Sequence, residues 1–229
     1  PYALPDEVQA TRVLNGVLDL GINLIDTAPA YGSSEERIGR ALAARRREYL
    51  LSTKVGEVFV DGHSIYDYSS AGMRQSVQRS LNALQTDAVD ILLIHSNGDD
   101  VEILERTDAV ETMLDLRDAG LARAVGFSGK TVAGARAALA WADVLMVEYH
   151  ARNESHADVI VEANEAGVGI LVKKGLASGH LPPSEAIPFV LGNPGVGALV
   201  VGGADLEHVR ENLAIAQRST RDASLQGTT

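Results

Sequence analysis

Seven short apolar runs, each separated from the next by a segment of helical character, dominate the 229-residue sequence. The runs are rich in Val, Ile and Leu and are nearly continuous in hydrophobicity, which is typical of parallel strands buried on both faces. They occupy residues 22–28, 48–55, 89–96, 122–129, 143–150, 169–175 and 197–203. This alternation predicts an α/β fold built around a parallel sheet.

The segments between the runs carry ordinary helix signals. Asp6 is placed to cap a first helix at about 6–20, and Gly21 follows its end. Ser69 or Ser70 opens a helix that ends near Leu84. Further helices are predicted at about 35–46, 101–119, 131–141, 154–166, 183–192 and 205–217.

Uninterrupted strand–helix units favour a (β/α)8 TIM barrel over an open doubly wound sheet, which would show a GxGxxG turn after its first strand. The count is one strand short, and a helix precedes the first apolar run. We therefore expect the first barrel strand to be missing from this sequence. We predict a single barrel domain over residues 1–217 and a polar C-terminal tail at 218–229.

Composition excludes several classes of function. The net charge of −11 argues against a nucleic-acid surface, and the absence of cysteine rules out disulfides and thiolate chemistry. No apolar run approaches the roughly 18 residues of a membrane span, and the N-terminus shows no secretory signal. We expect a cytoplasmic protein with neither a nucleic-acid nor a membrane partner. No metal site is expected either, and the sequence indicates no oligomeric state.

Ionisable residues end three successive apolar runs. Asp26 ends the first, Lys54 the second and His95 the third, and Tyr31 follows Asp26 by five residues. Active sites of barrels lie at the carboxyl ends of the strands, and side-chain alternation allows all three groups to point to one mouth. Taken alone, each has an ordinary explanation as a loop cap, a rim lysine, a core histidine or a turn tyrosine. Their joint occurrence favours a common site.

Several segments resemble the aldo-keto reductase family. They are GINLIDTAPAYGSSEERIGRAL, LSTKV, VDILLIHS, AVGFSG and HVRENLA, and the likeness runs from about residue 6 to 217. The family has the (β/α)8 fold, and its first barrel strand precedes the first helix. Its catalytic tetrad falls on Asp26, Tyr31, Lys54 and His95.

The resemblance implies reduction of an aldehyde or ketone to an alcohol with a nicotinamide cofactor. A lysine ammonium beside a phenol favours the phenolate, so Lys54, oriented by Asp26, is expected to make Tyr31 the general acid. His95 is expected to hydrogen-bond the carbonyl oxygen and set its angle. Which small carbonyl compound is the substrate is not indicated.

The implied cofactor site departs from the family pattern. The usual Ser-Asn pair that holds the carboxamide is Ser128-Gly129, and the usual Gln is Met146. A lysine, Lys173 or Lys174, takes the place of the stacking aromatic. The implied cofactor-binding residues are Ser128, Lys173, Gly202, Gly203, Glu211 and Asn212. NADP(H) is favoured because the resemblance implies it as the usual cofactor, and NAD(H) is possible because no cation matches the usual 2′-phosphate positions.

Two other functions stay open. An inward-facing lysine of the pair Lys173-Lys174 could form a Schiff base, as in barrel aldolases. The altered carboxamide clamp is also compatible with a non-catalytic family member that binds cofactor. Finally, the long segment 56–70 carries Phe59, Tyr66 and Tyr68, which could form an apolar wall of the substrate site, a lid or mere loop packing.

Overall fold

The computed structural model describes residues 6–226 of the chain, and the side chains of residues 6–219. The chain divides into two compact units, the first ending at Leu145 and the second beginning at Met146. The first unit holds all four residues of the predicted tetrad. The two units are therefore described one at a time.

The first unit is built on parallel strands that occupy five of the predicted apolar runs. In spatial order they are β1 (Leu24–Asp26), β2 (Leu50–Val55), β5 (Val89–His95), β6 (Ala122–Ser128) and the start of β7 (Val144–Glu148). The ladder register sets Asp26 beside Ser52 and His95 beside Ser128. The carboxyl ends of adjacent strands thus meet at one edge, where the ionisable residues lie.

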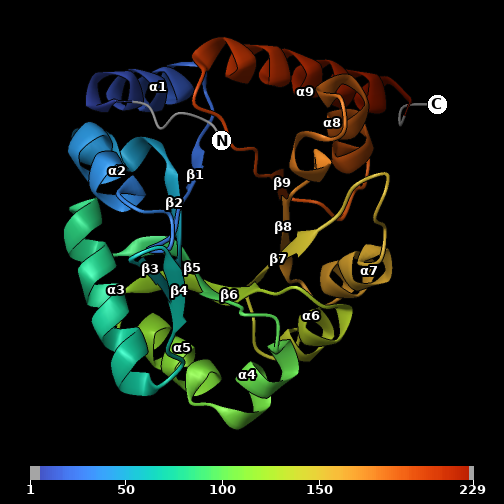
Figure 1. The fold of residues 1–229 in the computed structure, drawn as a ribbon. Helices are drawn as coiled ribbons and strands as arrows, with labels where there is room; N and C mark the ends of the chain where they lie inside the picture. Colours follow the sequence, from blue (N-terminus) through green and yellow to red (C-terminus); the bar gives the residue numbers. More distant parts are fainter. Residues whose placement is uncertain (1–5, 227–229) are drawn as a thin grey trace. The chain divides into compact units, whose positions relative to one another are not determined.

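One helix precedes β1 and the others alternate with the strands of this unit. Helices α2 (Ser34–Leu42), α3 (Ser70–Leu84) and α5 (Ala109–Asp118) lie along one face of its sheet (Figure 1). Asp6 caps the first helix by accepting a hydrogen bond from the amide of Gln9, and Ser69 caps the third by accepting one from Gly72, as predicted. The bounds are α1 Glu7–Asp19, α2 Ser34–Leu42, the 3-10 helix η1 Ala43–Glu48, α3 Ser70–Leu84, α4 Asp100–Arg106, α5 Ala109–Asp118 and α6 Val132–Ala138.

The core of the first unit lies between the sheet and these helices. It contains fully buried aliphatic side chains from the strands, such as Leu51 and Leu92, and from the helices, such as Met73, Leu84 and Met113. Burial of one such side chain contributes roughly 1.5–3 kcal/mol. The core therefore fixes the strands whose ends carry the polar groups.

The second unit continues the alternation of strands and helices. Its sheet has the order β7-β8-β9, with β8 at Gly169–Lys173 and β9 at Ala198–Leu199. The helices are α7 Ala157–Glu165, the 3-10 helix η2 Ala177–Gly179, α8 Pro183–Leu191 and α9 Leu206–Gln226. Helix α9 extends past residue 217, where the sequence analysis ends it, and residues 227–229 of the expected tail lie outside the described residues.

All seven predicted strands are present, and together they form one sheet of parallel strands. The fold class is that of a (β/α)8 barrel in which, within residues 6–226, one strand is lacking. The predicted fold class, a (β/α)8 barrel short of one strand, is thus confirmed. None of the helices in this part of the chain is long and apolar enough to cross a membrane.

The prediction of one continuous helix at 101–119 was wrong, because this segment forms two helices, α4 and α5. Thr107 separates them: its hydroxyl donates to the carbonyl of Ile103 and accepts from the amide of Ala109. A threonine side chain that competes for backbone groups in this way ends one helix and starts another.

The long segment after β2 was expected to be a loop and is instead a β-hairpin. Strands β3 (Glu57–Val60) and β4 (His63–Tyr66) pair in antiparallel fashion around Asp61-Gly62. Both turn residues have positive φ angles, 50° and 83°. An Asp-Gly turn of this kind matches the twist of a two-residue hairpin.

Candidate active site

The predicted tetrad lies together at the carboxyl edge of the first unit's sheet. Asp26 ends β1, Lys54 is the penultimate residue of β2 and His95 ends β5. Tyr31 lies between β1 and α2, where its amide donates to the carbonyl of Ala28 and its carbonyl accepts from the amide of Ser34. Three strands and one hydrogen-bonded turn thus position the four side chains.

Asp26 and Lys54 form a buried ion pair. The Nζ of Lys54 lies 2.6 Å from Oδ2 of Asp26, with side-chain exposures of 1% for Lys54 and 7% for Asp26. The ammonium also donates to the carbonyl of Thr27 at 2.8 Å, and the hydroxyl of Ser52 donates to Oδ1 of Asp26 at 2.8 Å. Both charges are satisfied by geometry that a buried pair requires.

The ring of Tyr31 lies over the ammonium of Lys54. The distance from Nζ to the ring centroid is 4.9 Å. The same ring meets His95 edge-on, with the two ring centroids 6.0 Å apart and an interplanar angle of 89°. Tyr31 is 48% exposed, so the phenol connects a buried charge to a surface that a substrate can reach.

Glu57, the first residue of the hairpin, is a member of this site that the sequence analysis missed. Its Oε2 lies 2.7 Å from Nδ1 of His95. The signal that could have found it is the Asp61-Gly62 dipeptide between alternating residues, which predicts a hairpin directly after the strand of Lys54. Recognising the hairpin would have placed Glu57 beside the site.

The three aromatic residues singled out in this segment have different environments. The hydroxyl of Tyr68 donates to the carbonyl of His95 and accepts from the amide of Asn97, both at 2.9 Å. Burial raises the pKa of Tyr68 well above its usual range, which makes it a neutral structural tie. Phe59 and Tyr66 are exposed on the hairpin. The hairpin register places both on the same face as Glu57.

Ser128 ends β6 directly beside His95 in the ladder and is buried. The next residue must be small, because a Cβ at Gly129 would lie 2.6 Å from the Phe127 ring and 3.0 Å from Oδ2 of Asp100. Oδ2 of the buried Asp100 accepts from the amides of Lys130 and Thr131 and shapes this loop. The departure from a Ser-Asn pair thus has a packing cause.

In the second unit, the lysine pair lies at the carboxyl end of β8. Lys173 ends β8, and Lys174 follows with a φ of 53°. The Nζ of Lys174 lies 2.9 Å from Oε2 of Glu148, at the end of β7. Burial opposes the charge of Glu148, but hydrogen bonds from Lys174 and Asn153 outweigh it and lower the pKa of Glu148. Met146 is buried and offers no polar group at the position of the family's glutamine.

The remaining predicted cofactor residues also belong to the second unit. Gly202 and Gly203 lie in the exposed segment before α9, and Glu211 and Asn212 lie on that helix. At the start of α9, the side chain of Asp205 accepts a hydrogen bond from the amide of Glu207. Gly202 has open space where a Cβ would stand. The backbone there is accessible to a ligand.

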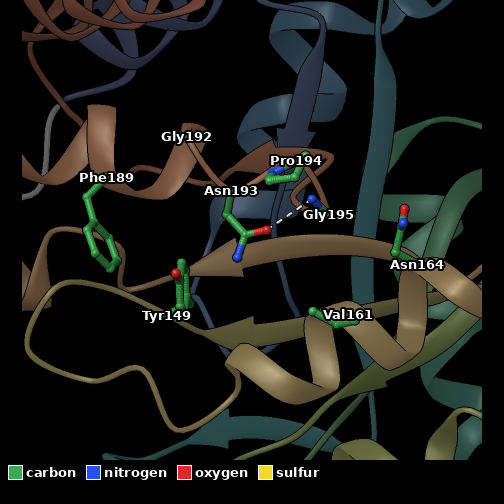
Figure 2. Close-up of a pocket in the computed structure, with 8 residues that line it drawn as sticks. All are labelled: Tyr149, Val161, Asn164, Phe189, Gly192, Asn193, Pro194 and Gly195. Carbon is green, nitrogen blue, oxygen red and sulfur yellow. Dashed lines mark hydrogen bonds between the residues drawn. The ribbon is translucent and has the colours of Figure 1, made fainter. Parts of the chain in front are cut away.

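A separate hollow of about 510 Å³ lies in the second unit (Figure 2). The side chain of Asn193 bridges its rim by accepting from the amide of Gly195 at 3.0 Å. The hollow contains none of the predicted site residues. Its lining is Tyr149, Val161, Asn164, Phe189, Gly192, Asn193, Pro194 and Gly195.

Known proteins similar to this chain are aldo-keto reductases and a further oxidoreductase. A crystal structure of an aldo-keto reductase from Pseudomonas aeruginosa superposes with a TM-score of 0.91 and 43% identity, over 96% of this chain and 86% of that one. A Bacillus subtilis protein, the oxidoreductase YqkF, is 26% identical over 93% of this chain and 85% of its own length. A Klebsiella pneumoniae aldo/keto reductase in complex with NADP and acetate is 26% identical, with a TM-score of 0.74, over 92% of this chain and 80% of that one.

The family model for the aldo/keto reductase family matches residues 3–186, which is most of the chain. This span includes Asp26, Tyr31, Lys54 and His95. The chain therefore belongs to the aldo/keto reductase family, whose members are oxidoreductases.

Proposed function

We propose that this protein reduces an aldehyde or ketone to the corresponding alcohol with NADPH or NADH, using Tyr31 as the general acid. The observation that carries the proposal is the position of the Lys54 ammonium, 4.9 Å from the centroid of the Tyr31 ring. When bound, a reduced nicotinamide supplies the hydride for the carbonyl carbon. The protein must then deliver a proton to the carbonyl oxygen.

Tyr31 is the group suited to deliver that proton. Its exposed ring can meet a substrate, and the ammonium beneath it stabilises the phenolate left after proton transfer. Asp26 holds this ammonium in place through a 2.6 Å contact. A positioned acid of this kind contributes roughly 10²–10⁴-fold to the rate.

His95 is the group suited to bind the carbonyl oxygen. It faces Tyr31 edge-on and ends the strand adjacent to Lys54. A hydrogen bond to the oxygen at which negative charge develops stabilises the transition state more than the ground state. In the proposed arrangement His95 orients the carbonyl while Tyr31 protonates it.

The residues at the cofactor positions fit a nicotinamide with fewer side-chain contacts than the family uses. The Ser128 hydroxyl can both donate and accept, and it lies beside His95. Neither Gly129 nor the buried Met146 adds a polar side chain. We assign Lys173, Gly202, Gly203, Glu211 and Asn212 to the remaining contacts with the cofactor. NADP(H) is the favoured form because the similar Klebsiella pneumoniae enzyme binds NADP.

The test is NADPH consumption with 4-nitrobenzaldehyde by the wild-type protein and by Tyr31→Phe. We expect the variant to lose about 10²-fold or more in turnover while its affinity for NADPH, measured by calorimetry, stays within about twofold. Tyr49→Phe is the matched control, because Tyr49 is a buried tyrosine just before β2, outside the site. Turnover retained in Tyr31→Phe would exclude this role for Tyr31.

The same measurements separate the alternatives. Binding of NADPH without consumption of any aldehyde would indicate a non-catalytic family member. Titration with NADPH and NADH side by side decides which cofactor is used. Irreversible labelling by borohydride in the presence of an aldehyde, lost in a Lys173 or Lys174 variant, would indicate a Schiff-base enzyme instead.

A further inference from the structure

The carboxylate of Glu57 links the hairpin to His95, because one of its oxygens contacts hairpin side chains and the other contacts the imidazole. Oε1 accepts hydrogen bonds from the hydroxyl of Ser64 at 2.6 Å and from that of Tyr66 at 3.0 Å. Oε2 lies 2.7 Å from Nδ1 of His95. The side chain of Glu57 is only 11% exposed. Its position is therefore fixed from both sides.

The hairpin holds this carboxylate by its register. Glu57 is opposite Tyr66, and Phe59 is opposite Ser64, so the two hydroxyls that hold Glu57 lie on its own face. The Tyr66 and Tyr68 rings stack, with centroids 6.2 Å apart, and Tyr68 bonds the backbone of His95. The hairpin is thus tied to the end of β5 by backbone and side chain.

Among the charges described around His95, that of Glu57 has the largest effect on whether the imidazole carries a second proton. Lys54, on β2, is offset by Asp26, on β1, at 2.6 Å. The turn before α2 contributes the phenol of Tyr31, and the segment after β4 contributes that of Tyr68. Among these groups Glu57 supplies the negative charge that no cation offsets. An opposite charge at this range favours the cationic form of a histidine.

The proposed reaction needs that cationic form. A neutral imidazole that donates its Nδ1 proton to Glu57 has a lone pair at Nε2, which would repel a carbonyl oxygen. A doubly protonated ring donates Nδ1–H to Glu57 and Nε2–H to the substrate at the same time. The ring keeps both protons, because Tyr31 delivers the one that the alkoxide takes up.

We propose that Glu57 is a positioning residue that holds His95 as an imidazolium, with Nδ1–H bound to Glu57 and Nε2–H presented to the carbonyl oxygen of the substrate. The second half of this inference rests on the proposed function, since it assigns the substrate oxygen to His95. The first half concerns only the protein and can be measured without substrate.

The first experiment is a titration of the histidine side chains by ¹⁵N-resolved NMR in wild type and in Glu57→Gln. Glutamine keeps an acceptor for Nδ1–H but removes the charge. We expect the imidazolium of His95 to lose its proton about one pH unit or more lower in the variant. His63, on the other face of the same hairpin, serves as the internal control and should titrate unchanged. An unchanged midpoint for His95 would overturn the proposal.

The second experiment is the pH profile of kcat/KM for aldehyde reduction by the same two proteins. Below both imidazole midpoints the two profiles should coincide, and above both the variant should be about tenfold slower. Glu105→Gln, which removes a charge from the exposed face of α4, is the matched control and should follow wild type. A loss of equal size at every pH would show that Glu57 has only a structural role.

The two proposals fail in distinguishable ways. A wild-type protein that reduces no carbonyl compound would contradict the proposed function, and the NMR titration would still decide whether Glu57 holds the proton on His95. A reductase whose His95 midpoint does not respond to Glu57→Gln would contradict this inference alone.

Discussion

The Nζ of Lys54 lies 2.6 Å from Oδ2 of Asp26, and this ion pair is almost entirely buried at the edge of the sheet. The carbonyl of Thr27 and the hydroxyl of Ser52 complete its hydrogen bonds. Removing one member of such a pair leaves an uncompensated buried charge, which lowers the free energy of unfolding by roughly 3–5 kcal/mol. The pair therefore links the stability of the site to its proposed chemistry.

Lys54→Met should lower the free energy of unfolding by about 3–5 kcal/mol, because Asp26 then stays buried without its cation. The double variant Lys54→Met/Asp26→Asn should recover more than about 1 kcal/mol of that loss. Urea denaturation of both single variants and the double variant measures this coupling. Strictly additive losses would show that the two charges do not depend on each other. Both variants with Lys54→Met should also lack reductase activity.

Glu35, on α2, should make stability depend on pH. Burial raises its pKa above the ordinary value of 4.5, although Thr53 and Ser80 donate hydrogen bonds to it. The folded state therefore holds the proton more tightly than the unfolded state does. The stability that the protonated group contributes is present below pH 4.5 and is lost as the pH rises through the folded pKa.

Replacement by a neutral isostere tests this sign. Glu35→Gln should remove the loss of stability that accompanies ionisation of Glu35. The free energy of unfolding of the variant, relative to that of wild type, should therefore increase from pH 4 to pH 7. Urea midpoints across that range provide the measurement, and Glu36→Gln on the same helix is the control. Parallel curves for wild type and Glu35→Gln would contradict the prediction.

The sequence predicted the seven strands, the fold class and the polar strand ends Asp26, Lys54 and His95, because apolar runs and ionisable strand ends are local patterns. Tyr31 was added to them by the resemblance to the aldo-keto reductase family. Asp26, Tyr31, Lys54 and His95 do lie together. Glu57 was missed because its role depends on a hairpin that returns its carboxylate to β5. The two helices on either side of Thr107 were missed because one hydroxyl outweighs helix propensity there.

Gly129→Asn, which restores the family's Ser-Asn pair, should weaken the protein instead of improving its cofactor site. A Cβ at this position would lie 2.6 Å from the ring of the buried Phe127. Overpacking of this kind costs typically about 1–3 kcal/mol. Urea denaturation and NADPH titration should show lower stability and no gain in affinity. Phe127→Leu in the same chain should recover part of the lost stability, and a tighter complex from Gly129→Asn alone would refute the packing explanation.

Asp100 should support the cofactor site without contacting the cofactor. Its Oδ2 accepts from the amides of Lys130 and Thr131 and from the Thr131 hydroxyl, and its Oδ1 accepts from the hydroxyl of Ser96. These bonds fix the loop that begins at Ser128. Asp100→Ala leaves the two amides and the hydroxyls without this acceptor. Each donor that stays buried without a partner lowers the free energy of unfolding by about 1–3 kcal/mol.

Loss of Asp100 should therefore lower both stability and NADPH affinity, because the Ser128 loop is no longer held against β5. Thr131→Val is the matched comparison, since it leaves both amides bonded to Asp100 and removes only the hydroxyl, which also caps α6 by accepting from the amide of Gly134. Its cost should be near 1 kcal/mol, with NADPH affinity close to wild type. Calorimetric titration with NADPH on both variants separates the two effects. If Asp100→Ala loses stability but binds NADPH like wild type, the loop of Ser128 does not depend on this carboxylate for its function.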